Sequence, residues 1–220
     1  MAHWAMVIDL RKCIGCGICN EVCEKINNVP PGTTWRRLVQ REIDGGQNGE
    51  RIFLPMSCMH CVKPSCLEVC PTRATYRRAD GIVDINYNLC VGCGSCVLAC
   101  PYRARSIPIQ DGPSETVVTE QDITVESPDR IGICTKCNFC LPRLEAGLSQ
   151  DLRPGVDPEA TPQCVRFCIA DALHFGDLDD SDSAVSELIR MHTTVRLQEE
   201  LGTEASVYYI VDDISFLTRR

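Results

Sequence analysis

The sequence of 220 residues has few aromatic side chains (5%) and no apolar run that approaches the roughly 18 residues of a membrane-spanning helix. Basic residues are also scarce, with 22 Lys and Arg against 30 Asp and Glu. The formal charge of −8 argues against a nucleic-acid-binding protein, which needs a basic surface. Residues 1–10 show no charged n-region, apolar h-region or twin-arginine pair, so no export signal is expected. These features favour a cytoplasmic protein, with export in a folded complex, or peripheral membrane attachment through a partner, as alternatives.

Motifs for nucleotide chemistry are missing as well. The sequence has no G-x-G-x-x-G and no P-loop, so flavin, nicotinamide or nucleotide binding is not supported. No nucleophile–base arrangement is visible, and His3, His174 and His192 have no chemical partners near them in sequence. We therefore expect no catalytic residue.

Cysteine is the abundant reactive residue, with 17 in the sequence. Hydrophobic residues make up only 44% of the chain, and this fraction includes the cysteines. The ordinary hydrophobic core is thin for this length, so a group bound to the cysteines is expected to complete it. Sixteen of them form four groups: Cys13, Cys16, Cys19 and Cys23; Cys58, Cys61, Cys66 and Cys70; Cys90, Cys93, Cys96 and Cys100; and Cys137 and Cys140 with Cys164 and Cys168.

The spacing of these groups indicates iron–sulfur clusters. Groups one and three both follow C-x2-C-x2-C-x3-C, which lets three thiolates reach one cubane while the fourth points at a different cluster. Glycines in the two loops (Gly15, Gly17, Gly92, Gly94) allow positive φ angles and let backbone N–H groups turn toward sulfur. Disulfides would need an oxidising compartment, and zinc sites use paired C-x2-C motifs, so both alternatives fit less well.

Local patterns predict several elements along the chain. Residues 33–43 and 51–54 flank the polar turn 44–49 and indicate a β-hairpin. Residues 81–86, 116–125 and 207–211 are typical of short strands, and the proline-rich stretch 149–162 of a loop. After Asp180, apolar residues recur at helical spacing, with Asp182 or Ser183 as the expected cap.

Several stretches together resemble one family. They are residues 6–9, Asn27-Asn28, the run from Cys58 to Cys70-Pro71-Thr72, the third group, Lys136-Cys137-Asn138-Phe139-Cys140, Arg143-Leu144, Gly147 and residues 175–178. In these motifs the chain resembles the four-cluster iron–sulfur subunits of molybdopterin oxidoreductases of the dimethyl sulfoxide, polysulfide and arsenate reductase type. The similarity extends over most of residues 6–180.

The resemblance implies an α+β fold with two fused bacterial-ferredoxin-like [4Fe–4S] modules. Residues 1–27 and 130–180 would form one module, from groups one and four, and residues 58–110 the other, from groups two and three. Residues 28–57 would be a hairpin insertion, 111–129 a strand and loop connection, and 181–220 a C-terminal extension with a helix and a strand.

The resemblance also implies the iron ligands of four [4Fe–4S] clusters. Their expected sets are Cys13, Cys16, Cys19 and Cys168; Cys137, Cys140, Cys164 and Cys23; Cys58, Cys61, Cys66 and Cys100; and Cys90, Cys93, Cys96 and Cys70. Nitrate reductase relatives have a tryptophan at the position of Cys93 and a three-iron cluster there. Glu24 and Ile169 stand where a proline often follows the last cysteine of a group.

Cys134 is the remaining thiol. Spacing alone permits either Cys134 with Cys137 or Cys137 with Cys140, since the three are evenly spaced. The family pattern, Lys-Cys-x-x-Cys with an arginine three residues later, fits Cys137, Cys140 and Arg143. We therefore predict that Cys134 is a buried non-ligand, with ligation or redox sensing as the alternative.

By this resemblance the chain is a non-catalytic electron-transfer subunit with no membrane insertion of its own. It would relay electrons between a catalytic subunit that holds a molybdenum or tungsten pterin and another redox partner, of which a quinone-reactive membrane subunit is one candidate. The alternatives are a soluble polyferredoxin, a subunit of a tungsten aldehyde-oxidoreductase-type enzyme, or a zinc or structural cysteine-rich module.

Charged residues near the ligands allow two interpretations. Lys12, Lys63, Lys136 and Arg143 lie beside cysteines and would raise cluster potentials, but a solvated surface or interface position is favoured for each. The pairs Arg36-Arg37, Arg77-Arg78 and Arg219-Arg220 are expected either to dock an anionic partner or to serve solubility. His60, inside group two, is expected to form a hydrogen bond or to pack rather than to be a ligand, because four thiolates already complete the set.

Overall fold

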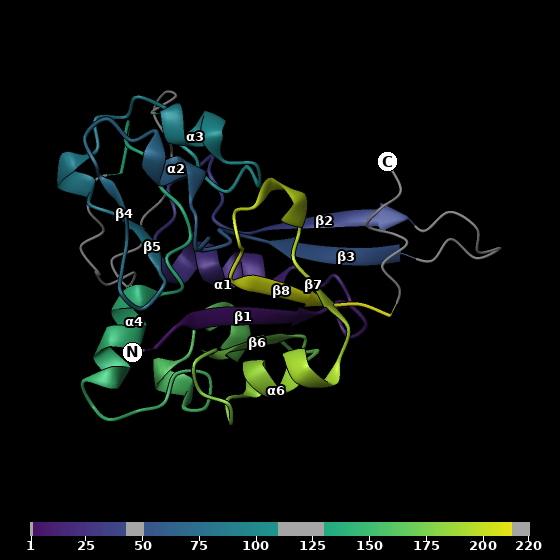
Figure 1. Cartoon of the computed structure of the whole chain (residues 1–220). Helices are drawn as coiled ribbons and strands as arrows, with labels where there is room; N and C mark the ends of the chain where they lie inside the picture. Colours follow the sequence, from purple (N-terminus) through teal and green to yellow (C-terminus); the bar gives the residue numbers. More distant parts are fainter. Residues whose placement is uncertain (1, 43–50, 110–129, 213–220) are drawn as a thin grey trace, which may run out of the picture.

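A four-stranded sheet joins the two ends of the chain. The computed structural model describes residues 2–42, 51–109 and 130–212. In the sheet, β1 (Trp4–Asp9) pairs antiparallel with β6 (Leu173–Asp177) and parallel with β8 (Val207–Ile210), and β7 (Thr194–Val195) pairs with β8. The strand order is β6-β1-β8-β7. The first strand is therefore central, and strands from late in the sequence flank it (Figure 1).

β1 is buried on both faces, and its side chains alternate between two cores. Trp4, Met6 and Ile8 belong to the main core, which also contains cysteines of groups one, two and four. Val7, on the opposite face, packs with Val185 of α6 (Ala184–Met191). The Ser183 side chain caps α6 by accepting a hydrogen bond from the Ser186 N–H, as expected from the sequence.

Short helices carry the cysteine groups. On one side of the sheet lie α1 (Ile18–Ile26), α4 (Leu141–Leu148) and α5 (Gln163–Arg166), with α1 against α5. A second region holds α2 (Ser65–Glu68), α3 (Ser95–Ala99) and the two-stranded sheet of β4 (Thr75–Arg77) and β5 (Val83–Ile85). Three single turns of 3-10 helix complete the list: Tyr87–Leu89, Pro158–Ala160 and Glu199–Leu201. The fold is thus two ferredoxin-like modules of mixed α and β structure.

A long two-stranded ribbon occupies the position of the expected hairpin. β2 (Arg37–Glu42) pairs antiparallel with β3 (Arg51–Met56), in a register that matches Arg37 with Met56. The ribbon extends away from the body of the molecule in Figure 1. The expected turn at 44–49 and the expected strand at 116–125 lie outside the described residues. The strands expected at 81–86 and 207–211 correspond to β5 and β8.

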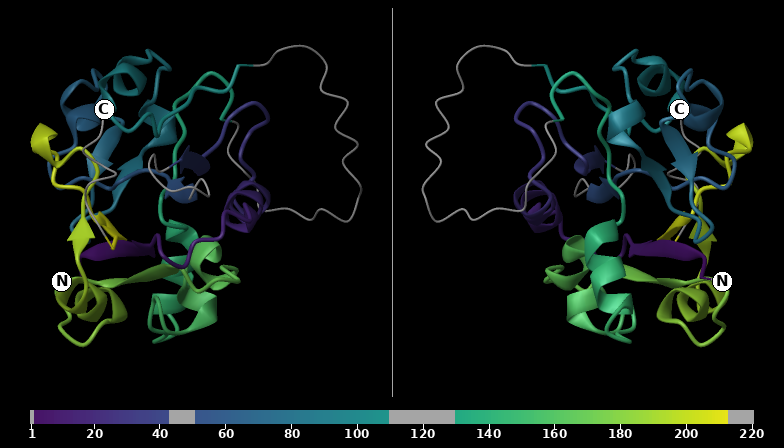
Figure 2. Two further views of the ribbon diagram at one scale, coloured as in Figure 1. Left: turned by 90° about the vertical axis from the view of Figure 1, so that its right-hand side faces the viewer. Right: turned by 90° about the vertical axis from the view of Figure 1, so that its left-hand side faces the viewer.

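Polar contacts connect the two modules with each other, with the hairpin segment and with the C-terminal extension. Ser106 and Thr135 form an isolated antiparallel bridge. Trp35 Nε1 donates to Thr135 Oγ1 at 2.7 Å, and the Tyr102 and Thr203 hydroxyls are 2.6 Å apart. The second module lies directly beside the main sheet in both views of Figure 2. In the three described stretches, no helix has the length and apolar character needed to cross a bilayer.

Candidate functional site

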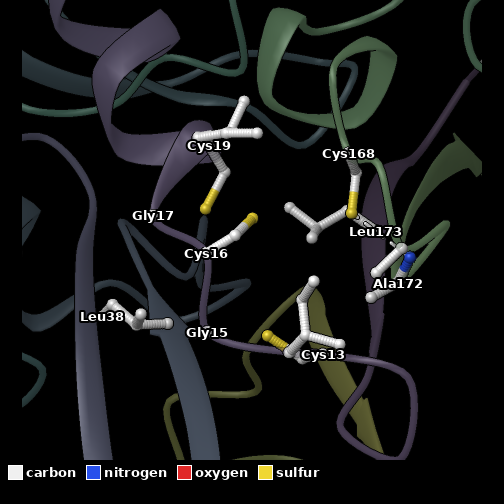
Figure 3. Close-up of a pocket in the computed structure, with 12 residues that line it drawn as sticks. Cys13, Gly15, Cys16, Gly17, Cys19, Leu38, Cys168, Ala172 and Leu173 are labelled. Carbon is white, nitrogen blue, oxygen red and sulfur yellow. Dashed lines mark hydrogen bonds between the residues drawn. The ribbon is translucent and has the colours of Figure 1, made fainter.

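Four thiols surround a hollow at one end of the molecule. Cys13 and Cys16 lie on the loop before α1, Cys19 is in its first turn, and Cys168 follows α5. Their sulfur atoms face a common space in Figure 3. The hollow has an empty volume of about 320 Å³, part of it open to solvent. These four cysteines are one complete set expected from the sequence.

A second hollow of the same size lies in the other module. It is lined by Cys70, Cys90, Cys93 and Cys96, which form another expected set. Cys134 also lines it. From the sequence, Cys134 was a possible alternative ligand only within group four. The structure instead places this thiol beside cysteines of groups two and three.

The remaining eight cysteines lie deeper and form two further clusters of neighbouring thiols. Cys23 interacts electrostatically with the three thiols expected to share its cluster, and Cys61 does the same with its own expected partners. These two sets are Cys23, Cys137, Cys140 and Cys164, and Cys58, Cys61, Cys66 and Cys100. Cys137 also interacts electrostatically with Cys58, so the two deep sets are adjacent.

The thiols surround spaces rather than converging on points. All seventeen cysteines are free. Among the described residues, no three His, Cys, Asp or Glu side chains are close enough together to hold a single metal ion. The chemistry of each donor set, four thiols around a hollow, fits a [4Fe–4S] group.

The two glycine-containing loops have the same backbone conformation. All four glycines have positive φ angles, as predicted. Gly17 and Gly94, with φ of 77° and 78°, cap α1 and α3, and this left-handed conformation favours glycine because it lacks a Cβ. The loops therefore deliver Cys19 and Cys96 at equivalent positions of the two modules.

A turn repeats after the last cysteine of three groups. Arg73, Arg103 and Asp171 each lie three residues after Cys70, Cys100 or Cys168 and have positive φ angles between 47° and 55°. A buried alanine follows each of them. The turn directs a backbone N–H at the cysteine sulfur: Thr75 N to Cys70 Sγ at 3.4 Å, Ala104 N to Cys100 Sγ at 3.5 Å, and Ala172 N to Cys168 Sγ at 3.3 Å.

Group one uses a side chain for the same purpose. Helix α1 continues through Cys23 to Ile26, so this turn cannot form. Instead, Asn27 Nδ2 lies 3.6 Å from Cys23 Sγ and 3.9 Å from Cys140 Sγ. An amide donor thus reaches two thiols of one expected set.

The Lys-Cys-Asn-Phe-Cys segment forms a strained turn. Phe139 and Cys140 have φ angles of 57° and 56°, which are uncommon for residues with a Cβ. Phe139 is buried and stacks on the His60 ring at a centroid distance of 3.7 Å. His60 Nδ1 accepts a hydrogen bond from Val83 N–H, so His60 is a packing histidine, as predicted.

Three cations are buried between the thiols, two of them contrary to expectation. Lys136 was expected at the surface and Arg36 in an exposed basic pair, but their exposed fractions are only 1% and 2%. Arg105, which the sequence analysis did not single out, is 5% exposed. None of the three has an ion-pair partner among the described residues, and Arg36 Nη1 and Arg105 Nη2 have no hydrogen-bond partner there. Thiolates would supply the missing negative charge.

The other charged residues beside the cysteines behave differently. Lys12 and Lys63 are at the surface, where they pair with Asp171 and Glu204. Arg143 donates to the Thr161 and Pro158 carbonyl oxygens and so holds the loop between the halves of group four. Arg78 pairs with Asp80 and Glu145, and Arg219-Arg220 lies outside the described residues.

Thiol acidity varies between the sets. Burial raises the pKa of Cys61 and Cys137 to about 12, so these thiols are protonated at neutral pH and release protons when metal binds. A hydrogen bond with the Cys134 side chain lowers the pKa of Cys96 to about 6. For Cys134 the same hydrogen bond raises the pKa.

Two features escaped the sequence analysis. One is the repeated turn, although its signal, an alanine four residues after the last cysteine (Ala74, Ala104, Ala172), is present in the sequence. The other is the set of buried cations. For Arg36, the adjacent Arg37 indicated an exposed basic pair rather than a buried side chain.

Comparisons with known proteins agree with this geometry. Residues 5–71 and residues 50–119 each match a family described as "4Fe-4S dicluster domain". The chain is 40% identical to the iron–sulfur subunit of a putative dimethyl sulfoxide reductase of Halobacterium salinarum, over 98% of this chain and 81% of the relative. Identity is 39% to a subunit of the selenate reductase of Mesobacillus selenatarsenatis, over 94% and 72%. It is 38% to a subunit of the tetrathionate reductase of Salmonella typhimurium, over 98% and 75%.

Proposed function

Because this chain belongs to the iron–sulfur electron-transfer subunits of molybdopterin oxidoreductases, we propose that its sixteen grouped cysteines hold four [4Fe–4S] clusters in one row. The ligand sets are those expected from the sequence, with Cys134 outside them. The chain itself is non-catalytic and works with a catalytic subunit.

The observation that carries the proposal is the neighbour pattern of the thiols. The two end sets line separate hollows, and the two deep sets lie next to each other through Cys58 and Cys137. The resulting order begins at the set of Cys13, passes through the sets of Cys137 and Cys58, and ends at the set of Cys90. Each four-cysteine group contributes to two sets, which keeps neighbouring sets close.

The chain's own groups suit an anionic cofactor. A [4Fe–4S] cluster, when bound, takes up and releases one electron at a potential set by hydrogen bonds, nearby charge and exposure. The N–H groups of Thr75, Ala104 and Ala172, and the Asn27 amide, point at ligand sulfurs and stabilise their negative charge.

The two ends of the row are the natural contact points for partners. Cys16 and Cys93 are the exposed cysteines, and they belong to opposite end sets. Exposed apolar residues lie beside each: Ile14, Phe167 and Ile169 near the first set, and Leu89, Val91 and Leu98 near the other. One end would meet the catalytic subunit, with a molybdenum or tungsten pterin, and the other a second redox partner such as a quinone-reactive membrane subunit.

Anaerobic purification with metal analysis tests the proposal. We expect a brown protein with about sixteen irons per chain, if each of four clusters has four irons, isolated together with a larger subunit. Stable isolation as a monomer would favour the polyferredoxin alternative, and colourless protein with zinc would favour a structural module. Fewer than about twelve irons, with all sixteen cysteines intact, would contradict the four-cluster assignment.

A cytoplasmic location remains our prediction. Fractionation of cells tests it: we expect the chain and its catalytic partner in the cytoplasmic fraction. Recovery outside the cytoplasm would support export of the folded complex.

A further inference from the structure

The three buried cations occupy particular positions relative to the proposed cluster sets. Arg36 enters the main core from the start of the β2–β3 ribbon, and its Nη2 lies 3.1 Å from Met6 Sδ. Its positive charge interacts with Cys19 of the first set and with three thiols of the second: Cys23, Cys137 and Cys164. Arg36 is therefore located in the interval between these two sets.

Arg105 has the equivalent position in the other module. Its positive charge interacts with Cys58 and Cys66 of the third set and with Cys96 of the fourth. Its Nη1 donates to Thr75 Oγ1 at 3.0 Å and approaches Cys134 Sγ at 3.6 Å, which fixes the guanidinium beside the second hollow.

Lys136 lies in the remaining interval, between the modules. Its Nζ donates to the carbonyl oxygen of Cys137, a residue of the second set, at 2.9 Å, and to that of Val83. Its charge also acts on Cys66 of the third set. The row thus alternates between thiol sets and cations: first set, Arg36, second set, Lys136, third set, Arg105, fourth set.

From this alternation we propose that Arg36, Lys136 and Arg105 are redox-positioning residues, each of which makes reduction of the two flanking clusters more favourable. The inference rests on the proposed function, because it assumes the four cluster sets. An added electron increases the negative charge of a cluster, and a nearby cation in a poorly solvated interior stabilises that charge strongly. A cation between two clusters also reduces the repulsion that an electron on one exerts on its neighbour.

Redox titration of the anaerobically isolated complex, followed by EPR, tests the inference. In Arg36→Met we expect the ratio of oxidised to reduced cluster, at a fixed potential, to rise at least tenfold for the first and second clusters. This corresponds to about 59 mV for one electron. Arg105→Met should shift the third and fourth clusters instead, and Lys136→Met the second and third. Signals are assigned from single Cys→Ser variants.

Two kinds of control separate charge from structure. Lys12→Met removes a cation next to Cys13, and the Lys12 side chain is 47% exposed. Because water and salt screen this charge, the ratio of oxidised to reduced cluster should change less than twofold. Arg36→Lys keeps the charge and should retain the wild-type potentials. Arg36→Met and Arg105→Met could keep their full iron content and show unchanged potentials, or shifts no larger than that of Lys12→Met. Either result would reject the inference but leave the proposed function standing.

Loss of clusters would also be decisive. If Arg36→Met and Arg36→Gln lose iron while Arg36→Lys keeps both clusters at wild-type potentials, the positive charge itself is required. If Arg36→Lys loses them too, the side chain acts through its shape, and the inference is wrong. Wild-type protein that holds no clusters would reject the proposed function, and the inference with it.

Discussion

Cys134 shows how closely a thiol can approach a cluster site without belonging to its expected ligand set. It is 2% exposed, and its backbone N–H donates to Cys90 Sγ at 3.4 Å. Its side chain lies between Arg105 and Cys96. The residue therefore contributes hydrogen-bond donors and packing, while Cys70, Cys90, Cys93 and Cys96 already provide four thiols.

We expect Cys134→Ser to keep the full iron content of about sixteen per chain, because the serine hydroxyl can still donate a hydrogen bond in place of the thiol. Cys137→Ser is the matched comparison, three residues further along, and should lose about four irons. Iron determination with EPR measures both. A loss of about four irons in Cys134→Ser would show that Cys134 is a ligand.

In group one, the Asn27 side-chain amide takes the place of the backbone N–H that points at the last cysteine of the other three groups. Asn27→Ala removes the amide near Cys23 and Cys140, and a hydrogen bond to a charged acceptor contributes roughly 1.5–3 kcal/mol. The hydrogen bond stabilises the more negative, reduced state more than the oxidised state. We therefore expect the reduction potential of the second cluster, which Cys23 and Cys140 would share, to fall by roughly 30–60 mV. Redox titration checks the shift, with Gln150→Ala, at an exposed residue just after α4, as the control. An unchanged potential would mean that Asn27 does not act on these sulfurs.

At the scale of elements, the residue after the last cysteine of groups one to three decides whether the helix can continue through that cysteine. Pro71 and Pro101 follow Cys70 and Cys100, and a residue before proline avoids helical conformation, so α2 and α3 end early. Glu24 allows α1 to continue to Ile26. Ile169 has no such effect, because α5 ends at Arg166 and the turn at Asp171 forms without a proline.

Gly92 tests the packing of the loop that carries group three. A Cβ at this position would lie 2.0 Å from the carbonyl oxygen of Gly132, and its φ is 66°. Gly92→Ala should therefore force the two segments apart, with a loss of about 3 kcal/mol or more. Gly202→Ala has a similar φ of 65° but open space around it, and should cost about 1 kcal/mol.

Denaturant unfolding of the iron-loaded protein, together with iron content, measures the two glycine variants. We expect Gly92→Ala to lose iron from the fourth cluster as well as stability. Equal stability and equal iron content in the two variants would contradict the close approach of Gly92 to Gly132.

On the scale of the whole molecule, the proposed ligands and the core are largely the same residues. The main core combines β1 side chains with buried cysteines such as Cys19, Cys23 and Cys164. Arg36, Lys136 and Arg105 add three positive charges to this interior with no carboxylate partner among the described residues. Burial of an uncompensated charge is strongly unfavourable.

Removal of iron should therefore unfold most of the chain. We expect an anaerobic chelator to abolish most of the far-ultraviolet circular dichroism, because the cations lose their counter-charge and the thiols lose the iron that they bind. The iron-loaded protein under the same buffer is the control. Near-native circular dichroism and a cooperative thermal transition after iron removal would contradict this expectation.

Local features were predictable from the sequence, and long-range ones were not. The residue pattern predicted α6 with a cap at Asp182 or Ser183, of which the structure has Ser183. It also predicted the strand positions of β5 and β8 and the positive φ angles of Gly17 and Gly94. The pairing of β1 with β8 depends on contacts across almost the whole chain, which no local pattern contains. Burial of Arg36 depends on thiols brought together by folding, so the pair Arg36-Arg37 misled the sequence analysis.

The position of β1 between β6 and β8 has a consequence for biosynthesis. Cys13 is synthesised long before Cys168 and before both strands that flank β1. The groups at 58–70 and 90–100 are complete much earlier. Under the proposed ligation, metal loading during translation can start with the middle segment, and Cys13, Cys16 and Cys19 wait until Cys168 has been synthesised.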